Sequence, residues 1–309
     1  MSTNTAISFQ GIQKIYQTKR GSIQAIKELS FSVCEGEIFG FAGPNGAGKS
    51  TAIKILVGLL SPDQGEGKIF SEACGTLAAK KMLGYLPEVT LYHEFMGAKE
   101  LLKIHAGLAG LRGKDLDEKC DEALERVGLG DRMKSRLHEF SKGMKQRFGI
   151  AQAIVGEPKL LILDELTSGL DPQAQASLLD LLRELRQQGL TIFFSSHHLA
   201  EIEKICDSVA ILHKGELRAF GSLNQVLGEE QKLRVEVELK NENLEPDSLW
   251  VKDKLSNFVA YLDEESTASA IQSLGEDLQR VVSVKPQRRS LESLFLELTT
   301  DHEEKKNTL

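Results

Sequence analysis

Nine consecutive residues near the N-terminus have the types and the spacing that bind phosphate. They are Gly43, Pro44, Asn45, Gly46, Ala47, Gly48, Lys49, Ser50 and Thr51, and the first eight fit the pattern G-x-x-x-x-G-K-[ST] at every defined position. The glycines let backbone N–H groups curl around an anion, and a helix N-terminus adds partial positive charge. We expect Lys49 to reach the terminal phosphates of a nucleotide and the Ser50 hydroxyl to bind Mg²⁺. A glycine-rich turn without a ligand is the competing interpretation, and the complete match disfavours it.

The elements on either side of this loop are those that must position it. Residues 38–42 form a short apolar run that predicts a buried strand. After the loop, apolar residues recur at helical spacing from Ile53 to Leu60, and Ser61-Pro62-Asp63 is expected to end the helix. Strand, glycine loop and helix in this order are the context in which the phosphate-binding pattern is specific.

A pair of carboxylates follows a second apolar run. Asp164 and Glu165 come directly after residues 160–163, which predict a buried strand. In a parallel α/β sheet ligands bind at that end of the strands. Asp164 can hold Mg²⁺, directly or through water. Glu165 can act as the general base that polarises an attacking water.

Bulk properties narrow the class of protein. A chain of 309 residues is long enough for two domains, and its net charge of −7 argues against a nucleic-acid partner. No segment has the roughly 18 uncharged apolar residues of a membrane span, and the first five residues do not resemble a secretory signal. The four cysteines are widely scattered, which disfavours a structural metal or a disulfide framework and favours a reducing cytoplasm.

The order of elements predicts an α/β domain over residues 1–225. Strands are expected at 159–163 and 191–194, with a leucine-rich helix between them that stops at Gly189. Residues 96–153 read as a helical subdomain inserted into this core. Lys214-Gly215 separates two apolar runs and predicts a hairpin.

Residues 230–300 predict a separate, small α+β domain. Apolar and charged residues alternate over 233–239, which is typical of a half-buried antiparallel strand. A loop containing Pro246 follows, and further strands are expected at 249–251, 258–262 and 281–284, with a helix around 268–274. Ser290 is a candidate N-cap for a terminal helix over 291–298. Residues 301–309 are polar and are expected to be a disordered tail.

Four further motifs make the resemblance to a known family plain. They are Gly84-Tyr85-Leu86-Pro87-Glu88, Phe140-Ser141-Lys142-Gly143-Met144-Lys145-Gln146-Arg147, Ser168-Gly169-Leu170-Asp171 and Ser195-Ser196-His197. With the phosphate loop and the carboxylate pair they stand in the order of the Q-loop, signature, D-loop and switch histidine of ABC proteins. Over residues 1–225 the chain resembles the nucleotide-binding subunit of an ABC transporter.

This resemblance implies a P-loop NTPase fold, with ATP and Mg²⁺ as ligands. It implies composite sites in a head-to-tail dimer, in which Ser141 and Gly143 of one copy face the ATP held by the other. Asp171 would join the two sites, His197 would contact the γ-phosphate, and Tyr16 would stack on adenine. Glu88 would ligate Mg²⁺ beside Ser50 and Asp164.

Some residues depart from the family pattern. Lys142 replaces a glycine and Met144 a glutamine in the signature, and Glu88 replaces the usual glutamine. Ser141 and Gly143 are kept, so function is expected to survive. These forms resemble a branch in which the ATPase pairs with a separate transmembrane permease and mostly exports drugs, lipids, antibiotics or ions. The chain is then expected on the cytoplasmic face of the membrane, with residues 89–95 helping to dock the permease.

Several alternatives stay open at this point. Tyr16 could be an ordinary core or surface aromatic, His198 competes with His197, and Asp171 could simply cap a helix. Homodimers and heterodimers with a related ATPase are equally compatible. A soluble ABC-type ATPase acting on ribosomes or nucleic acid is the main alternative function, and a binding module without turnover is another. The transported substrate is not encoded in any of these motifs.

Overall fold

The computed structural model describes residues 4–19, 21–228, 232–240, 249–252, 257–287 and 290–304. The chain forms two compact units, Met1–Leu223 and Asn224–Leu309. Sequence analysis placed the end of the first domain at residue 225. The loop predicted around Pro246 lies outside the described residues.

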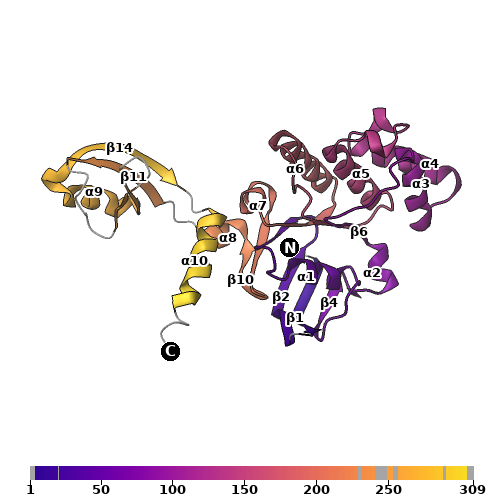
Figure 1. Cartoon of the computed structure of the whole chain (residues 1–309), viewed down its shortest axis with the longest axis horizontal. Helices are drawn as coiled ribbons and strands as arrows, with labels where there is room; N and C mark the ends of the chain where they lie inside the picture. The colour runs from indigo at the N-terminus through magenta and orange to yellow at the C-terminus, as the bar shows by residue number, and fades with distance from the viewer. Residues whose placement is uncertain are drawn as a thin grey trace. The chain divides into compact units, whose positions relative to one another are not determined.

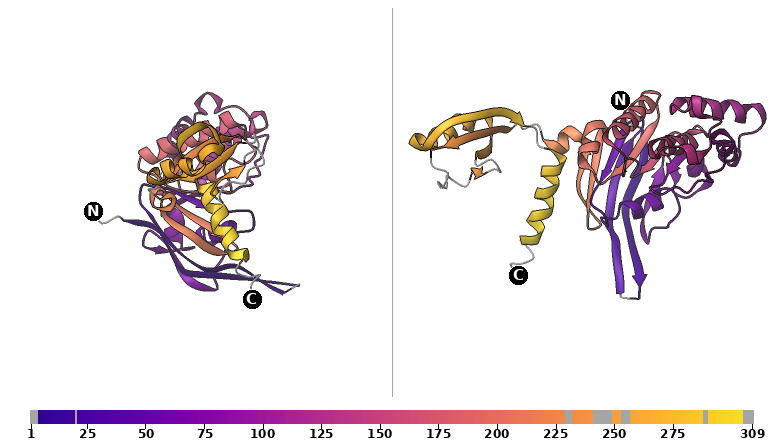
Figure 2. Two further views of the ribbon diagram at one scale, coloured as in Figure 1. Left: turned by 90° about the vertical axis from the view of Figure 1, so that its left-hand side faces the viewer. Right: turned by 45° about the horizontal axis from the view of Figure 1, so that its top comes forward.

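The first unit is built on a sheet whose strands run in the order β5-β4-β1-β2-β10-β9-β3-β8-β7-β6 (Figure 1). The strands are β1 (Thr5–Thr18), β2 (Gly21–Cys34), β3 (Ile38–Ala42), β4 (Gln64–Ile69), β5 (Glu72–Ala73), β6 (Leu83–Leu86), β7 (Leu160–Asp164), β8 (Thr191–Ser196), β9 (Ser208–His213) and β10 (Glu216–Ser222). The far ends of β1 and β2 project beyond the neighbouring strands (Figure 2).

Neighbouring strands from β9 through β3, β8 and β7 to β6 are parallel. Every residue of β3, β7 and β8 is buried, as expected for strands covered on both faces. The loops that follow these three strands therefore leave the same edge of the sheet. The prediction of a parallel α/β core is confirmed, and β9 and β10 form the predicted hairpin.

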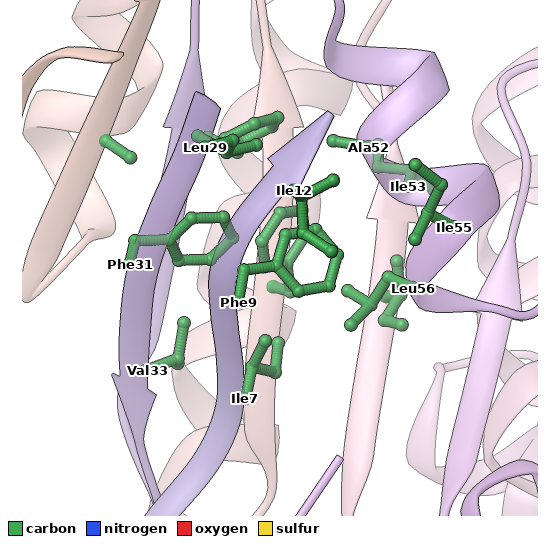
Figure 3. Close-up of a cluster of buried hydrophobic side chains, with 14 of the residues drawn as sticks. Ile7, Phe9, Ile12, Leu29, Phe31, Val33, Ala52, Ile53, Ile55 and Leu56 are labelled. Carbon is green, nitrogen blue, oxygen red and sulfur yellow. The ribbon is translucent and has the colours of Figure 1, made fainter. Parts of the chain in front are cut away.

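The main hydrophobic core of this unit lies between the sheet and α1 (Lys49–Leu56). Figure 3 shows apolar side chains of β1 and β2, among them Phe9 and Phe31, directed toward the same space as those of α1. Phe31 also stacks on Phe39 with ring centroids 5.4 Å apart. Each such ring contributes about 1.5–3 kcal/mol relative to an exposed one. This packing holds α1, and the loop before it, firmly against the sheet.

The other helices of the unit are α2 (Leu77–Lys81), α3 (Ala98–Leu108), α4 (Gly113–Arg126), α5 (Lys142–Ile154), α6 (Pro172–Gln187) and α7 (Leu199–Ile205). Helices α3 and α4 fall within the stretch predicted to be helical, 96–153, and α5 ends one residue beyond it. Of these, α3 and α4 lie side by side at one end of the unit (Figure 1).

Helix α1 ends earlier than its sequence predicted. Its last residue is Leu56, because Gly58 adopts a φ angle of 71° and reverses the chain. The amides of Leu59 and Leu60 both donate to the carbonyl oxygen of Lys54. The apolar periodicity continues to Leu60 in a turn, so the glycine, and not Ser61-Pro62-Asp63, ends the helix.

The second unit has a sheet of its own with the order β12-β13-β11-β14, in which the neighbouring strands are antiparallel. Its elements are α8 (Leu223–Leu227), which begins at the last residue of the first unit, β11 (Lys232–Leu239), β12 (Val251–Lys252), β13 (Phe258–Leu262), α9 (Glu264–Ser273), β14 (Leu278–Gln287) and α10 (Leu291–Glu304). Alternate residues of β11 are buried together with Trp250 and Phe258 in a separate core. Ser290 caps α10 by accepting from the amide of Ser293. Because α10 continues to Glu304, the first four residues of the predicted tail are helical.

Among the described residues, every helix is too short or too polar to span a lipid bilayer.

Candidate functional site

The phosphate-binding loop leaves the end of β3 and runs directly into α1. Gly48 is the N-cap of that helix and has a φ angle of 109°, a left-handed conformation that favours glycine. A β-carbon at Gly48 would also lie only 2.6 Å from the carbonyl oxygen of Ala25. The backbone thus follows a path that glycine permits, and the N–H groups of the first helical turn, which have no partner inside a helix, remain for a ligand.

Lys49 is held inside this loop. Its side chain is 5% exposed, and its Nζ donates to the carbonyl oxygen of Gly43 at 2.6 Å. The same Nζ lies 3.2 Å from Oε1 of Glu165. A buried positive charge is therefore fixed where phosphate oxygens would meet it, and a charged acceptor binds an ammonium more strongly than a carbonyl does.

Asp164 ends β7 and is also buried. The Ser195 hydroxyl, from the neighbouring strand β8, donates to its Oδ1 at 2.6 Å. Burial raises the pKa of Asp164, because it disfavours the charged form, and the charges of Glu165 and Glu88 raise it further. The Ser195 hydrogen bond and Lys49 oppose this shift of the pKa. A cation beside Asp164 would relieve the same cost.

Glu165 stands in a left-handed conformation with a φ angle of 50°. For a residue with a side chain this costs about 1–2 kcal/mol, and such strain clusters at functional sites. The turn brings Oε2 to 2.6 Å from Nδ1 of His197 and 3.3 Å from its backbone amide. Because a carboxylate can only accept, Nδ1 of His197 carries the proton in this bond.

The other carboxylate oxygen of Glu165 is available to a substrate. Oε1 is buried and, among the described residues, accepts no hydrogen bond, although it lies 3.2 Å from the Lys49 Nζ. A buried oxygen without a donor needs one. A water molecule between Glu165 and a phosphate would supply it, which is the arrangement that general-base catalysis requires.

These groups line a cavity of about 590 Å³, within the range of small-molecule sites. The predicted site residues that line it are Pro44, Asn45, Gly46, Gly48, Lys49, Ser50, Thr51, Glu88, Glu165 and His197. Gly43, Ala47 and Asp164 do not line the cavity; the first two belong to the same loop, and Asp164 directly precedes Glu165 in the chain.

Tyr16 lies at the margin of the cavity, near the end of β1. It is half-exposed, and its hydroxyl is 3.5 Å from the Thr51 hydroxyl. Its partner across the strand pair is Ile23, which lines the cavity with Gln24 and Ala25. Stacking of Tyr16 on adenine stays a prediction that this position allows.

Ser141, Gly143 and Asp171 do not line the cavity of their own chain. Ser141 is the N-cap of α5 and accepts from the amide of Met144 at 3.3 Å, and Gly143 lies in the first turn of α5. Asp171 is the N-cap of α6 and accepts from the amide of Ala174 at 2.9 Å. The capping alternative for Asp171 is therefore observed, while a role for these residues toward a second copy stays a prediction.

Sequence reasoning missed part of the cavity wall. Ile23, Gln24 and Ala25 come from β2, and Lys214 and Gly215 from the turn between β9 and β10. The amide of Lys27 donates to the carbonyl oxygen of Gly215 at 2.9 Å, which joins the two segments. The only signal in the sequence was the hairpin turn itself, and nothing in it pointed to β2.

The donor set fits Mg²⁺ held partly by a nucleotide. Ser50 and Glu88 line the cavity, and Asp164 lies beside it. Within the part of the chain that the structure describes, no three His, Cys, Asp or Glu side chains are grouped to hold a metal. Mg²⁺ usually keeps several waters and is bound by one or two carboxylates plus substrate phosphates, which agrees with this arrangement.

We expect Asp164→Asn to stabilise the chain when no nucleotide is bound. The pKa of Asp164 is raised in the folded protein, so its ionisation weakens folding. This cost is absent below the unfolded pKa of about 3.9, and it grows as pH rises through the folded pKa. Asparagine keeps an oxygen acceptor for Ser195 without the charge. Urea unfolding at pH 7 should show a gain of about 1 kcal/mol in the free energy of unfolding.

The gain from Asp164→Asn should shrink as the pH approaches 4. Asp180→Asn, on the exposed side of α6, serves as the control and should change the free energy of unfolding by less than about 0.5 kcal/mol. A loss of stability in Asp164→Asn at pH 7 would show that the charge is well compensated in the free protein.

Both the sequence and the structure of the chain are similar to those of known ABC transporter proteins. Residues 26–168 match the family model described as "ABC transporter". The chain is 37% identical over 305 residues to YdbJ of Bacillus subtilis, an uncharacterised ABC transporter ATP-binding protein, with 96% of each chain covered. It is 34% identical over 229 residues to the Nod factor export ATP-binding protein I of a Rhizobium species, covering 74% of each.

A solved structure of the ATP-binding subunit of an ABC transporter matches with a TM-score of 0.62 and 33% identity, over 72% of this chain and 91% of that one. The near full-length relative points to this family. So does the structure, in which the phosphate loop, the carboxylate pair and the histidine lie together at one cavity. The chain therefore belongs to the ATP-binding proteins of ABC transporters, a family of ATPases.

Proposed function

We propose that this chain binds and hydrolyses ATP as a subunit that dimerises on ATP and drives export through a separate transmembrane permease. The observation that carries the proposal is that Lys49, Glu165 and His197 lie side by side in one cavity. Glu165 lies between the other two, with its oxygens 3.2 Å from the lysine and 2.6 Å from the histidine.

Each of these residues has a distinct part in hydrolysis. Lys49 and the first turn of α1 would bind the phosphates, and Ser50, Asp164 and Glu88 would hold Mg²⁺, which would supply charge neutralisation there. Glu165 receives the proton of the attacking water at Oε1. His197 fixes the orientation of Glu165 through the proton on Nδ1, and only as the doubly protonated imidazolium does it also donate from Nε2 to the γ-phosphate.

A second copy completes the site. The residues that line the cavity contact a phosphate from one side, and transition-state charge needs donors on the other side as well. The N-terminus of α5, with Ser141 as its cap, is a suitable donor in a partner copy because it combines a hydroxyl, backbone N–H groups and a helix dipole. Asp171, at the start of α6, would then lie at the contact between the copies.

Mixing two inactive variants tests the composite site. Lys49→Ala removes the phosphate loop's cation, and Ser141→Arg blocks the signature side, so each homodimer should have no working site. A mixed dimer keeps one intact site, with Lys49 from one copy and Ser141 from the other. We expect ATPase activity in the mixture to exceed that of either variant by at least about fivefold. If the ATPase activity of the mixture is no higher than the sum of the activities of the two separate variants, this would argue against sites shared between copies.

An apolar surface near the site suits the permease. Val89, Leu91 and Phe95 follow Glu88 in the chain and are 73%, 95% and 83% exposed. Tyr92, from the same segment, instead packs edge-on against Phe148 of α5 with ring centroids 5.3 Å apart. Exposed apolar groups gathered in this way mark interaction sites. Export is supported by the name of the Rhizobium relative, and docking to a permease would place the chain on the cytoplasmic face of the membrane.

Affinity purification from detergent-solubilised native membranes tests the partner. The tagged chain should recover a polytopic membrane protein in stoichiometric amount, identified by mass spectrometry. Leu91→Asp should lose it while keeping ATP binding, and Leu249→Asp, an exposed leucine of the second unit, is the matched control. Recovery of ribosomal or nucleic-acid-bound partners from the soluble fraction would favour a soluble ABC-type ATPase that acts on ribosomes or nucleic acid.

A further inference from the structure

A further buried carboxylate, besides Asp164 and Glu165, is joined to the loops of the candidate site. Glu201, on α7, is 7% exposed, and its Oε2 accepts two hydrogen bonds from hydroxyl groups. Thr167 donates at 2.6 Å and Ser196 at 3.0 Å. Both donors are buried, with Thr167 1% and Ser196 0% exposed.

The two hydroxyls belong to the two loops that carry the chemistry. Thr167 lies two residues after Glu165, in the loop that ends at Asp171. Ser196 is the last residue of β8 and directly precedes His197. One carboxylate oxygen of Glu201 therefore joins the loop after β7 to the loop after β8.

The orientation of this junction is fixed at each end. The Ser196 hydroxyl donates to Glu201 and accepts from the amide of His198 at 3.0 Å, so it cannot rotate without losing a bond. The amide of Glu201 donates to the carbonyl oxygen of His198 at 3.0 Å. The backbone on either side of His197 is thus tied to the same glutamate.

A carboxylate at this buried position is unfavourable for the free energy of folding. Burying a charge costs several kcal/mol unless hydrogen bonds compensate, and a hydrophobic residue on α7 would pack against the core without that cost. Charge-assisted hydrogen bonds are short and directional. What the carboxylate adds is therefore a defined geometry between the two loops.

We propose that Glu201 is a positioning residue that couples the loop ending at Asp171 to the Glu165–His197 pair. The proposal rests on the proposed function, in which Asp171 lies at the contact between two copies. Movement of that loop when the copies meet is transmitted through Thr167 and Glu201 to Ser196. It thereby reaches His197, the next residue in the chain. Glu201 does not touch ATP.

Substitution of either end should lower turnover without weakening nucleotide binding. Thr167→Val keeps the shape and removes the donor, and Glu201→Ala removes the acceptor. We expect kcat for ATP to fall about tenfold or more in each, with KM within twofold, and the Hill coefficient for ATP to approach one. Glu201→Gln keeps an acceptor oxygen and should recover part of the lost kcat. Glu203→Gln, on the same helix, is the control.

A double-mutant cycle separates this role from general loss of folding. If Thr167 and Glu201 act together, the fall in kcat for Thr167→Val with Glu201→Ala should be close to that of one variant alone. Values of kcat within twofold of the unaltered chain, or a normal Hill coefficient despite lower kcat, would overturn the coupling. So would a fall in kcat that disappears on cooling below the melting transition of the variant. Absence of ATPase activity in the unaltered chain would instead overturn the proposed function, and the two failures are distinguishable.

Discussion

We expect Glu165→Gln to remove ATP hydrolysis and to leave ATP binding intact. Glutamine has nearly the same shape but cannot take a proton from water, and a general base of this kind contributes about 10²–10⁴-fold. We therefore expect steady-state kcat to fall at least about 100-fold. Removing one negative charge near the phosphates should change ATP binding only slightly. The affinity for ATP, measured by equilibrium fluorescence with a labelled nucleotide, should stay within about threefold of that of the unaltered chain.

The same substitution should trap the ATP-bound dimer. If hydrolysis is what separates the copies, Glu165→Gln should elute as a dimer in ATP and as a monomer without it. Glu184→Gln, at an exposed position on α6, is the control and should keep normal turnover. Steady-state hydrolysis near that of the unaltered chain would mean that another group accepts the proton of the water.

Lys49→Ala should abolish tight binding of ATP. Charge-assisted hydrogen bonds contribute about 1.5–3 kcal/mol each, and the lysine is expected to contact two phosphates. We expect affinity to fall at least about 100-fold in equilibrium binding. Lys54→Ala, exposed on the last turn of the same helix, should bind normally.

Lys49→Ala carries a second effect that needs its own control. Without the ammonium 3.2 Å from its Oε1, the buried Glu165 carboxylate loses a partner, and the free protein should be less stable. Combining Lys49→Ala with Glu165→Gln removes both charges and should restore the melting temperature without restoring binding. Tight binding of ATP by this double variant would show that the loop backbone alone holds the phosphates.

The sequence was most informative where chemistry demands fixed spacing. The phosphate loop and the pair Asp164-Glu165 each follow a short apolar strand, and parallel strands bring their ends to one edge of the sheet. Those two facts were enough to predict that the carboxylates serve the phosphate loop as its acidic partners, while the contact between Lys49 and Glu165 is seen only in the folded chain. His197 was identified only by its resemblance to the switch histidine, and it follows β8, which lies between β3 and β7 in the sheet.

Other parts depended on contacts between distant residues. The pairing of β1 and β2 has several register shifts, which break the alternation that would have revealed two long strands. Ala25 and Gly215 meet only because β10 lies beside β2. Glu201 looks like an ordinary solvated charge on an amphipathic helix, and only the folded chain places Thr167 and Ser196 against it.

The separate core of the second unit has an evolutionary consequence. Because Trp250, Phe258 and the buried face of β11 pack among themselves, replacing them need not disturb the packing around Phe31 and Phe39 in the first unit. Natural selection can therefore change, exchange or discard the C-terminal module while the machinery for ATP is conserved.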